Sequence, residues 1–136
     1  MDLRYYYGRF DGAEWHVHPM AYAGTRLYAG EDDYSGLVAL DPADPNLAYI
    51  STNADPATGD PLISLGDGQR HYEIFRGQTQ DYGATWLWTA ITSNSTVDNL
   101  RPTVPAWPGH TALLWLRGRY RNMLHFSQDI VGVIDP

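Results

Sequence analysis

Residues 79–86, TQDYGATW, place a hydroxyl, a carboxylate, a glycine and a tryptophan close together in the chain. An aspartate carboxylate accepts backbone N–H bonds inside a tight turn, a glycine supplies a positive φ, and a threonine bonds back to the turn. A tryptophan at the end of such a segment packs beneath it. The segment therefore predicts a hairpin turn, which requires a β-strand on each side.

Short β-type runs separated by turn residues recur along the whole chain. No segment has the apolar periodicity of an amphipathic helix. The 13 Gly and 9 Pro are the residues expected where short strands alternate with tight turns. We expect an all-β fold with strands within residues 3–7, 14–18, 36–40, 47–52, 71–76, 85–91, 101–104, 110–116 and 130–134.

Length, charge and composition exclude several classes of function. The 136 residues suit one domain, and the net charge of −7 disfavours nucleic acid and anionic membranes as partners. The chain has no Cys and no Lys, which excludes disulfides, thiolate metal sites and cysteine or lysine nucleophiles. No apolar run approaches the ~20 residues of a membrane span, and no secretory leader is visible at the start.

Internal similarity indicates a repeated unit. Residues 10–15, FDGAEW, align with residues 81–86, DYGATW, and keep the Gly and the Trp. In this alignment Phe10 stands where Asp81 does, and Glu14 stands where Thr85 does. The two stretches predict two copies of a four-stranded unit, the first with a degenerate turn.

Residues 79–86 also fit the pattern S/T-x-D-x-G-x-T-W, which resembles the Asp-box of sialidase-like β-propellers. Residues 71–122, with residues 31–56 before them, are similar to the BNR-repeat family, whose relatives include propeller-type polysaccharide lyases. The resemblance implies four-stranded antiparallel blades and a carbohydrate ligand, with Asp81 in a structural role. It assigns residues 1–20 to the last strands of one blade, 31–92 to a complete blade and 98–136 to the first strands of a further blade.

About two blades are too few for a closed ring, because propellers contain four to eight. Two explanations stay open. The chain is the C-terminal part of a longer family member, or several copies associate head to tail into a homo-oligomer. The resemblance further implies an extracellular or periplasmic location.

Candidate ligand-binding residues come from the two segments that enter the innermost strands, residues 29–36 and 95–105. Arg101 is the first candidate, because a guanidinium at this position can hold a sugar carboxylate with two hydrogen bonds. Asp33 and Asn99 are the further substrate-binding candidates. The alternative for Arg101 is a salt bridge with Asp33 or Asp98.

Candidate catalytic residues are His16, His18 and Tyr34. The two histidines form His-x-His on a strand, so their side chains share one face. A catalytic zinc needs three protein ligands, so the pair alone predicts no metal site, and the sequence identifies no cofactor. The alternative is a partly buried histidine pair that bonds to the backbone.

The resemblance implies either an enzymatic or a non-enzymatic function. A lyase of this type would catalyse β-elimination on a uronic-acid polysaccharide, with Arg101 on the carboxylate, His16 or His18 as base and Tyr34 as acid. A sialidase-type hydrolase would need more inward arginines than one chain supplies. The alternative is a lectin-like or structural propeller without enzyme activity, in which aromatic rings stack on sugars.

Overall fold

The computed structural model describes residues 3–136, and the regular secondary structure within them is entirely β. Three antiparallel sheets contain two, four and three strands, with consecutive strands as neighbours in each. The strands are β1 (Leu3–Phe10), β2 (Trp15–Gly24), β3 (Val38–Leu40), β4 (Leu47–Thr52), β5 (Glu73–Gln78), β6 (Leu87–Ala90), β7 (Asp98–Thr103), β8 (Ala112–Asn122) and β9 (His125–Ile134). The predicted all-β class is confirmed, and each expected run overlaps one strand. The described residues contain no helix that could cross a membrane.

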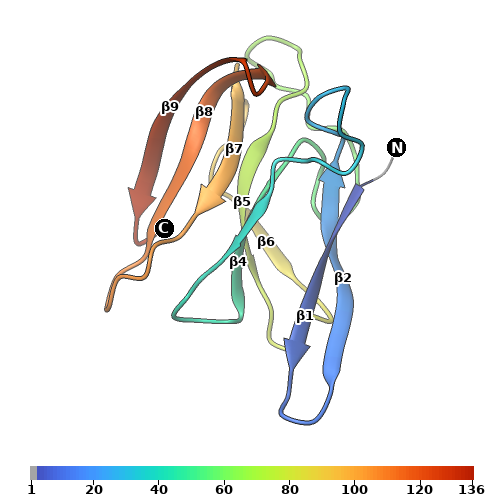
Figure 1. The fold of residues 1–136 in the computed structure, drawn as a ribbon, viewed down its shortest axis with the longest axis vertical. Helices are drawn as coiled ribbons and strands as arrows, with labels where there is room; N and C mark the ends of the chain where they lie inside the picture. Colours follow the sequence, from blue (N-terminus) through green and yellow to red (C-terminus); the bar gives the residue numbers. More distant parts are fainter. Residues whose placement is uncertain (1–2) are drawn as a thin grey trace.

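The four-stranded sheet lies between the other two. Figure 1 shows the β1–β2 hairpin on one side of it and the β7–β9 sheet on the other. Strand β2 contacts β4, while β7 contacts β3, β4 and β5. The central sheet is therefore covered on both faces.

Strand β4 explains this packing, because alternate side chains of a strand point to opposite faces. Ala48 and Ile50 belong to a buried cluster with Tyr7 and Met20 of the first sheet. Tyr49, which lies between them in sequence, belongs to a second cluster with Ile74, Leu113 and Trp115. A strand that is apolar on both faces is typical of a sheet with neighbours on both sides.

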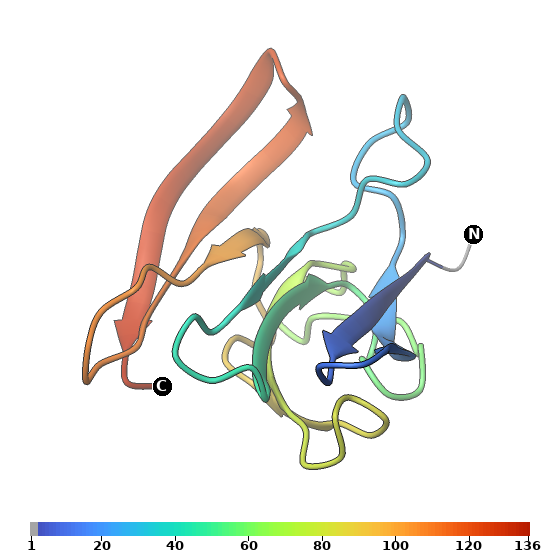
Figure 2. The same ribbon diagram turned by 60° about the horizontal axis from the view of Figure 1, so that its bottom comes forward.

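The β8–β9 hairpin is longer than the sequence predicts. Its pairing with β7 ends at Asp98 and Gly118, and beyond that point β8 pairs with β9 alone. Figure 2 shows the two-stranded part projecting away from the rest of the chain. The β8 sequence of this part, RYRN, lacks the apolar alternation that predicts strands, because it packs against no neighbouring sheet.

The turn between β5 and β6 has the hydrogen bonds that its sequence predicts. The Asp81 carboxylate accepts hydrogen bonds from the Thr85 amide at 2.8 Å and the Thr85 hydroxyl at 2.6 Å. Gly83 has a φ of 93°, and a Cβ there would lie 2.2 Å from the Tyr7 ring. The Trp86 indole donates to the Gly83 carbonyl and packs edge-on against Tyr7. This turn therefore fixes the second sheet against the first.

The turn between β1 and β2 corrects the alignment proposed for the first repeat. Asp11, and not the residue at position 10, supplies the carboxylate, which accepts from the amides of Ala13 and Glu14 at 2.8 and 2.9 Å. Phe10 instead packs against Trp15 across the hairpin. Asp11 precedes Trp15 by four positions, whereas Asp81 precedes Trp86 by five, so an ungapped alignment of the two tryptophans shifts the acid by one position.

Candidate functional site

Arg101 lies at an irregular point of β7, beside the start of β3. The pairing of β7 with β8 shifts register between Leu100 and Thr103, and Arg101 has a φ of 56°. Its amide donates to the Gly36 carbonyl at 2.8 Å. A positive φ is costly for a long side chain, and such residues gather at functional sites. The bulge turns Arg101 away from its regular place in the ladder.

The guanidinium of Arg101 lies among tyrosines. It donates to the Tyr34 hydroxyl, and its central carbon lies 5.2 Å from the centre of the Tyr120 ring and 5.6 Å from that of Tyr34. Tyr28 packs against both rings, at centroid distances of 5.8 Å to Tyr34 and 6.0 Å to Tyr120. We call Arg101, Tyr28, Tyr34 and Tyr120 the arginine–tyrosine cluster. Cation–π attraction to these rings stabilises the position of the Arg101 guanidinium. The rings supply no negative charge, so a carboxylate can still bind to it.

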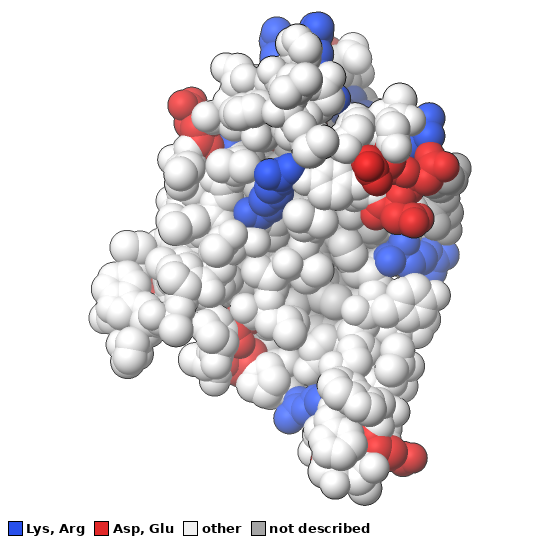
Figure 3. All heavy atoms as spheres, viewed as in Figure 1, with Lys and Arg blue, Asp and Glu red and all other residues white. Residues whose placement is uncertain are grey.

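No ion pair of Arg101 occurs among residues 3–136. The predicted alternative, a salt bridge to Asp33 or Asp98, does not form: Asp98 bonds to the Tyr72 amide and to His71, and Asp33 is exposed. On the face shown in Figure 3, one group of acidic side chains lies at the upper right with basic side chains beside it, and other basic groups lie away from this acidic group. The Arg101 guanidinium thus keeps its charge uncompensated by a carboxylate of the described chain.

Two polar atoms close to this cluster also lack a partner. The Tyr120 hydroxyl and the Gln128 amide nitrogen are buried and make no hydrogen bond with the described residues. Gln128 pairs with Gly118, so its side chain lies on the same face of the sheet as that of Tyr120. Buried polar groups are normally satisfied, and an unsatisfied group calls for a ligand or a water. A molecule with hydroxyl and carboxylate oxygens would satisfy both.

An apolar hollow of about 330 Å³ adjoins Arg101. Its wall includes Leu114, Leu116 and Ile130, and Ile130 is 75% exposed. The site therefore combines a cation, polar atoms and an apolar surface, as ligand pockets commonly do.

Asn99 is not available to a ligand, which corrects its predicted role in substrate binding. Its side chain is fully buried. The amide nitrogen donates to the Tyr72 carbonyl, Glu73 and the Ser95 hydroxyl, and the amide oxygen accepts from the Trp115 indole at 2.9 Å. Asn99 holds β7 to β5 and β8, and its role is structural.

His16 and His18 do not join Arg101 and Tyr34 in this chain. They lie near the β1–β2 turn, whereas Tyr34 lies in the connection that follows the opposite end of β2. His16 precedes Gly24, the last residue of β2, by roughly 25 Å of extended chain. The structure therefore separates the predicted base from the predicted acid and from the carboxylate-binding group.

His16 has a carboxylate partner of its own. Its Nε2 lies 2.7 Å from Asp11 Oδ2, and this hydrogen bond raises the pKa of His16 and lowers that of Asp11. With Glu14 these residues place three potential metal ligands within 4.8 Å of one another. The turn amides and His16 already account for the position of the Asp11 carboxylate.

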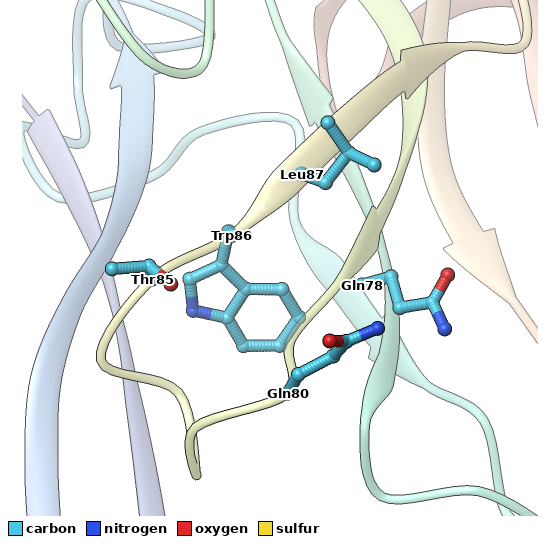
Figure 4. Close-up of a pocket in the computed structure, with 5 residues that line it drawn as sticks. All are labelled: Gln78, Gln80, Thr85, Trp86 and Leu87. Carbon is cyan, nitrogen blue, oxygen red and sulfur yellow. The ribbon is translucent and has the colours of Figure 1, made fainter.

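Two further hollows lie near the β5–β6 turn. The first measures about 310 Å³ and is lined by uncharged side chains from the end of β5, the turn and the start of β6: Gln78, Gln80, Thr85, Trp86 and Leu87 (Figure 4). The second contains Arg9, whose guanidinium donates to Asn46 at 2.8 Å and lies over the Tyr82 ring. These hollows lack the unsatisfied buried groups found beside Arg101.

His71 connects the long loop before β5 to β7, which carries Arg101. Its Nε2 lies 2.8 Å from Asp67, and its Nδ1 lies 3.4 Å from Asp98. Burial lowers the pKa of His71, but the two carboxylates outweigh burial and raise the pKa above the ordinary 6.5. Protonated His71 therefore stabilises the fold below pH 6.5, and this contribution is lost as the pH rises through the folded-state pKa.

Replacing Asp98 with asparagine should lower the pKa of His71, because one of its two carboxylates becomes neutral. An NMR titration of the imidazole signals measures the change. Asp33→Asn removes an exposed acid from another loop and should leave the His71 pKa where it was. Equal His71 titration curves in wild type and Asp98→Asn would contradict this arrangement.

No family model matches the chain, and the comparisons with curated proteins and with solved structures find no match.

Proposed function

We propose that the protein binds an acidic carbohydrate at the arginine–tyrosine cluster. The observation that carries the proposal is the Arg101 guanidinium, which lies against Tyr34 and Tyr120 and has no carboxylate partner among residues 3–136. A uronic-acid carboxylate is planar and accepts two parallel hydrogen bonds from a guanidinium. Sugar hydroxyls suit the unpartnered Tyr120 and Gln128 groups, and sugar C–H faces suit aromatic and apolar walls.

Binding without turnover is the form of the proposal that the geometry favours. β-Elimination needs a base beside the proton α to the carboxylate, and general bases act within hydrogen-bond reach. His16 and His18 lie far along β2 from the cluster. The Tyr34 hydroxyl, which accepts a hydrogen bond from Arg101, is a group in the cluster that could exchange a proton, so lyase activity is the outcome to test against simple binding.

Calorimetry with a short uronic-acid oligosaccharide tests the proposal. The oligosaccharide should bind, and its carboxyl-reduced neutral counterpart should bind at least about tenfold more weakly, because it lacks the charge-assisted bond to Arg101. Ultraviolet absorbance of the same mixture detects the unsaturated product of an elimination. Equal affinity for the acidic and the neutral sugar would reject the proposal.

We further propose that the three sheets are blades of a β-propeller arc that associates with further copies. The outer faces of the first and last sheets expose large apolar side chains, with Tyr6, Trp15 and Val17 on one and Ile130 and Ile134 on the other. Exposed apolar patches of this kind mark protein interfaces. Head-to-tail packing of a second copy would cover the first of these faces and the part of the second around Ile134, and would leave the hollow at Ile130 open to a ligand.

Light scattering at micromolar concentration should therefore give a particle mass that is a multiple of the 15.3 kDa chain. Trp15→Asp places a charge on the outer face of the first sheet and should shift the mass toward the monomer. A wild-type protein that remains monomeric at this concentration would exclude the association.

A further inference from the structure

The end of the β8–β9 hairpin exposes apolar side chains where turns usually carry polar ones. Met123 and Leu124 form the turn between the two strands and are 73% and 86% exposed, and Phe126, at the start of β9, is 63% exposed. Gly, Asn, Asp and Ser are the residues favoured at turn positions. We call Met123, Leu124 and Phe126 the hairpin tip. Large apolar side chains that gather on a surface mark a place where a partner binds.

The turn does not depend on the side chains of Met123 and Leu124. The Asn122 side-chain oxygen accepts hydrogen bonds from the amides of Leu124 at 2.9 Å and His125 at 3.0 Å. An Asn side chain that bonds to the backbone in this way fixes a turn by itself. Neither apolar side chain belongs to a buried cluster of the described residues. Residues that break a local rule without a gain in packing are expected at a functional site.

The hairpin holds its tip away from the body of the chain. Pairing of β8 with β7 ends at Gly118, whereas pairing with β9 continues to Asn122, and Figure 2 shows this part projecting. At its base, the Tyr120 ring packs against Tyr28 and Tyr34. A paired and anchored element therefore presents the tip.

The hairpin behind the tip is basic, although the chain as a whole is acidic. Residues 117–128 contain three arginines and no Asp or Glu. The other residues contain six arginines and all sixteen acidic residues, which gives them a net charge of −10. None of the three hairpin arginines makes an ion pair within residues 3–136, and Asp32, in the connection after β2, pairs with Arg26 instead. The expectation that net charge disfavours anionic membranes therefore applies to the body of the chain and not to the projecting hairpin.

Two of the hairpin arginines lie at the depth of lipid phosphates when the tip enters a bilayer. Arg121 and Arg119 precede Met123 by two and four residues, which is roughly 7 and 13 Å of strand. An apolar surface that rests on a membrane sinks about 5–10 Å into the boundary between headgroups and acyl chains. Exposed arginines keep their stems against apolar surface and their guanidinium groups among the headgroups, where they pair with phosphate oxygens.

A bilayer suits the hairpin tip better than a second protein does. Even at roughly 200 Å² for each side chain, three side chains cover less than the about 800 Å² that each partner buries in a stable protein interface. A narrow projection also needs a matching pocket in a protein, but it needs none in a fluid bilayer.

We propose that the hairpin tip inserts into the surface of a phospholipid bilayer that contains anionic lipid, with Arg119 and Arg121 on lipid phosphates. This inference goes beyond the sugar binding proposed above and does not depend on it. The acidic body is repelled by the same surface, so the hairpin alone makes the contact and orients the protein on the membrane.

Co-sedimentation with vesicles tests the inference. Wild type should sediment with phosphatidylcholine vesicles that contain about one third phosphatidylglycerol, and should bind pure phosphatidylcholine more weakly. Met123→Ser with Leu124→Ser should lose at least about tenfold in vesicle affinity, because two inserted apolar side chains are removed. Arg119→Gln with Arg121→Gln should lose about fivefold for each arginine on the anionic vesicles and little on the neutral ones. Wild type that sediments with neither vesicle would overturn the inference.

Leu65→Ser is the matched control, since Leu65 is 89% exposed in the loop before β5 and lies outside the hairpin. It should keep full vesicle affinity. Circular dichroism checks that the double serine variant is folded, and its unchanged affinity for the uronic-acid oligosaccharide separates this test from that of the proposed function. Equal vesicle affinity in the double serine variant and in wild type would overturn the inference.

A tryptophan placed at the tip reports insertion directly. The fluorescence that Leu124→Trp adds to that of wild type should shift to shorter wavelength with anionic vesicles and should be quenched by brominated lipid, whereas that added by Leu65→Trp should not change. A tip signal that stays in water would count against insertion. So would a particle mass that falls toward the monomer in the double serine variant without vesicles, because the tip would then contact a second copy.

Discussion

Replacing Asn99 with leucine should lower the free energy of unfolding by about 3 kcal/mol or more, because it leaves several buried polar groups unsatisfied. The Asn99 side-chain amide bonds to four groups, including Glu73 and the Trp115 indole. Asn99 is fully buried, so no water replaces these bonds. Urea unfolding followed by tryptophan fluorescence measures the loss.

A double variant distinguishes lost hydrogen bonds from simple overpacking. Trp115→Phe removes the indole N–H that Asn99→Leu leaves without an acceptor, so the two changes together should cost less than the sum of their separate costs. Gln80→Leu makes the same kind of substitution at an exposed position with no hydrogen bond and should change stability by less than about 0.5 kcal/mol. Strictly additive costs for the double variant would show that the indole bond contributes nothing.

Arg101→Ala should weaken binding of the uronic-acid oligosaccharide by about 10- to 100-fold, the effect of losing a charge-assisted hydrogen-bonded contact. Arg101→Lys should recover only part of this loss, because lysine keeps the charge but cannot present two parallel donors to a carboxylate. The neutral counterpart of the sugar should show little difference among the three proteins. Calorimetry of each pair gives the comparison.

Arg26→Ala is the matched control, since Arg26 is an exposed arginine whose side chain already pairs with Asp32 at 2.5 Å. Its removal should leave oligosaccharide affinity within a factor of two or so, as is usual for exposed ion pairs. Retention of full affinity by Arg101→Ala would show that the cluster is not the binding site.

Much of the fold follows from local sequence signals. Alternating apolar residues and Gly- or Pro-bearing turns identified all nine strands, because most of them bury apolar side chains against a neighbouring sheet. The hydrogen bonds of the β5–β6 turn were predicted from residues 79–86, because each partner lies within a few positions of the others. The polar end of β8, residues 117–122, was not predicted as a strand, because its sequence has no alternation of apolar and polar residues.

The candidate site was predictable only in part. Arg101 and Tyr34 were selected as residues entering innermost strands, and the structure brings them into contact. Tyr28 and Tyr120 completed the cluster from segments that no local pattern connects, since 92 residues separate them. Asn99 was misassigned because burial of a polar residue depends on tertiary packing, which its flanking sequence does not reveal.

The most direct test of acidic-sugar binding is an NMR titration that follows the arginine side-chain Nε–H signals, assigned with Arg101→Lys. On addition of the uronic-acid oligosaccharide, we predict that the Arg101 signal shifts and saturates, while the Arg26 signal stays in place. An Arg101 signal that does not move when the sugar is bound would contradict the proposal that this guanidinium receives the carboxylate.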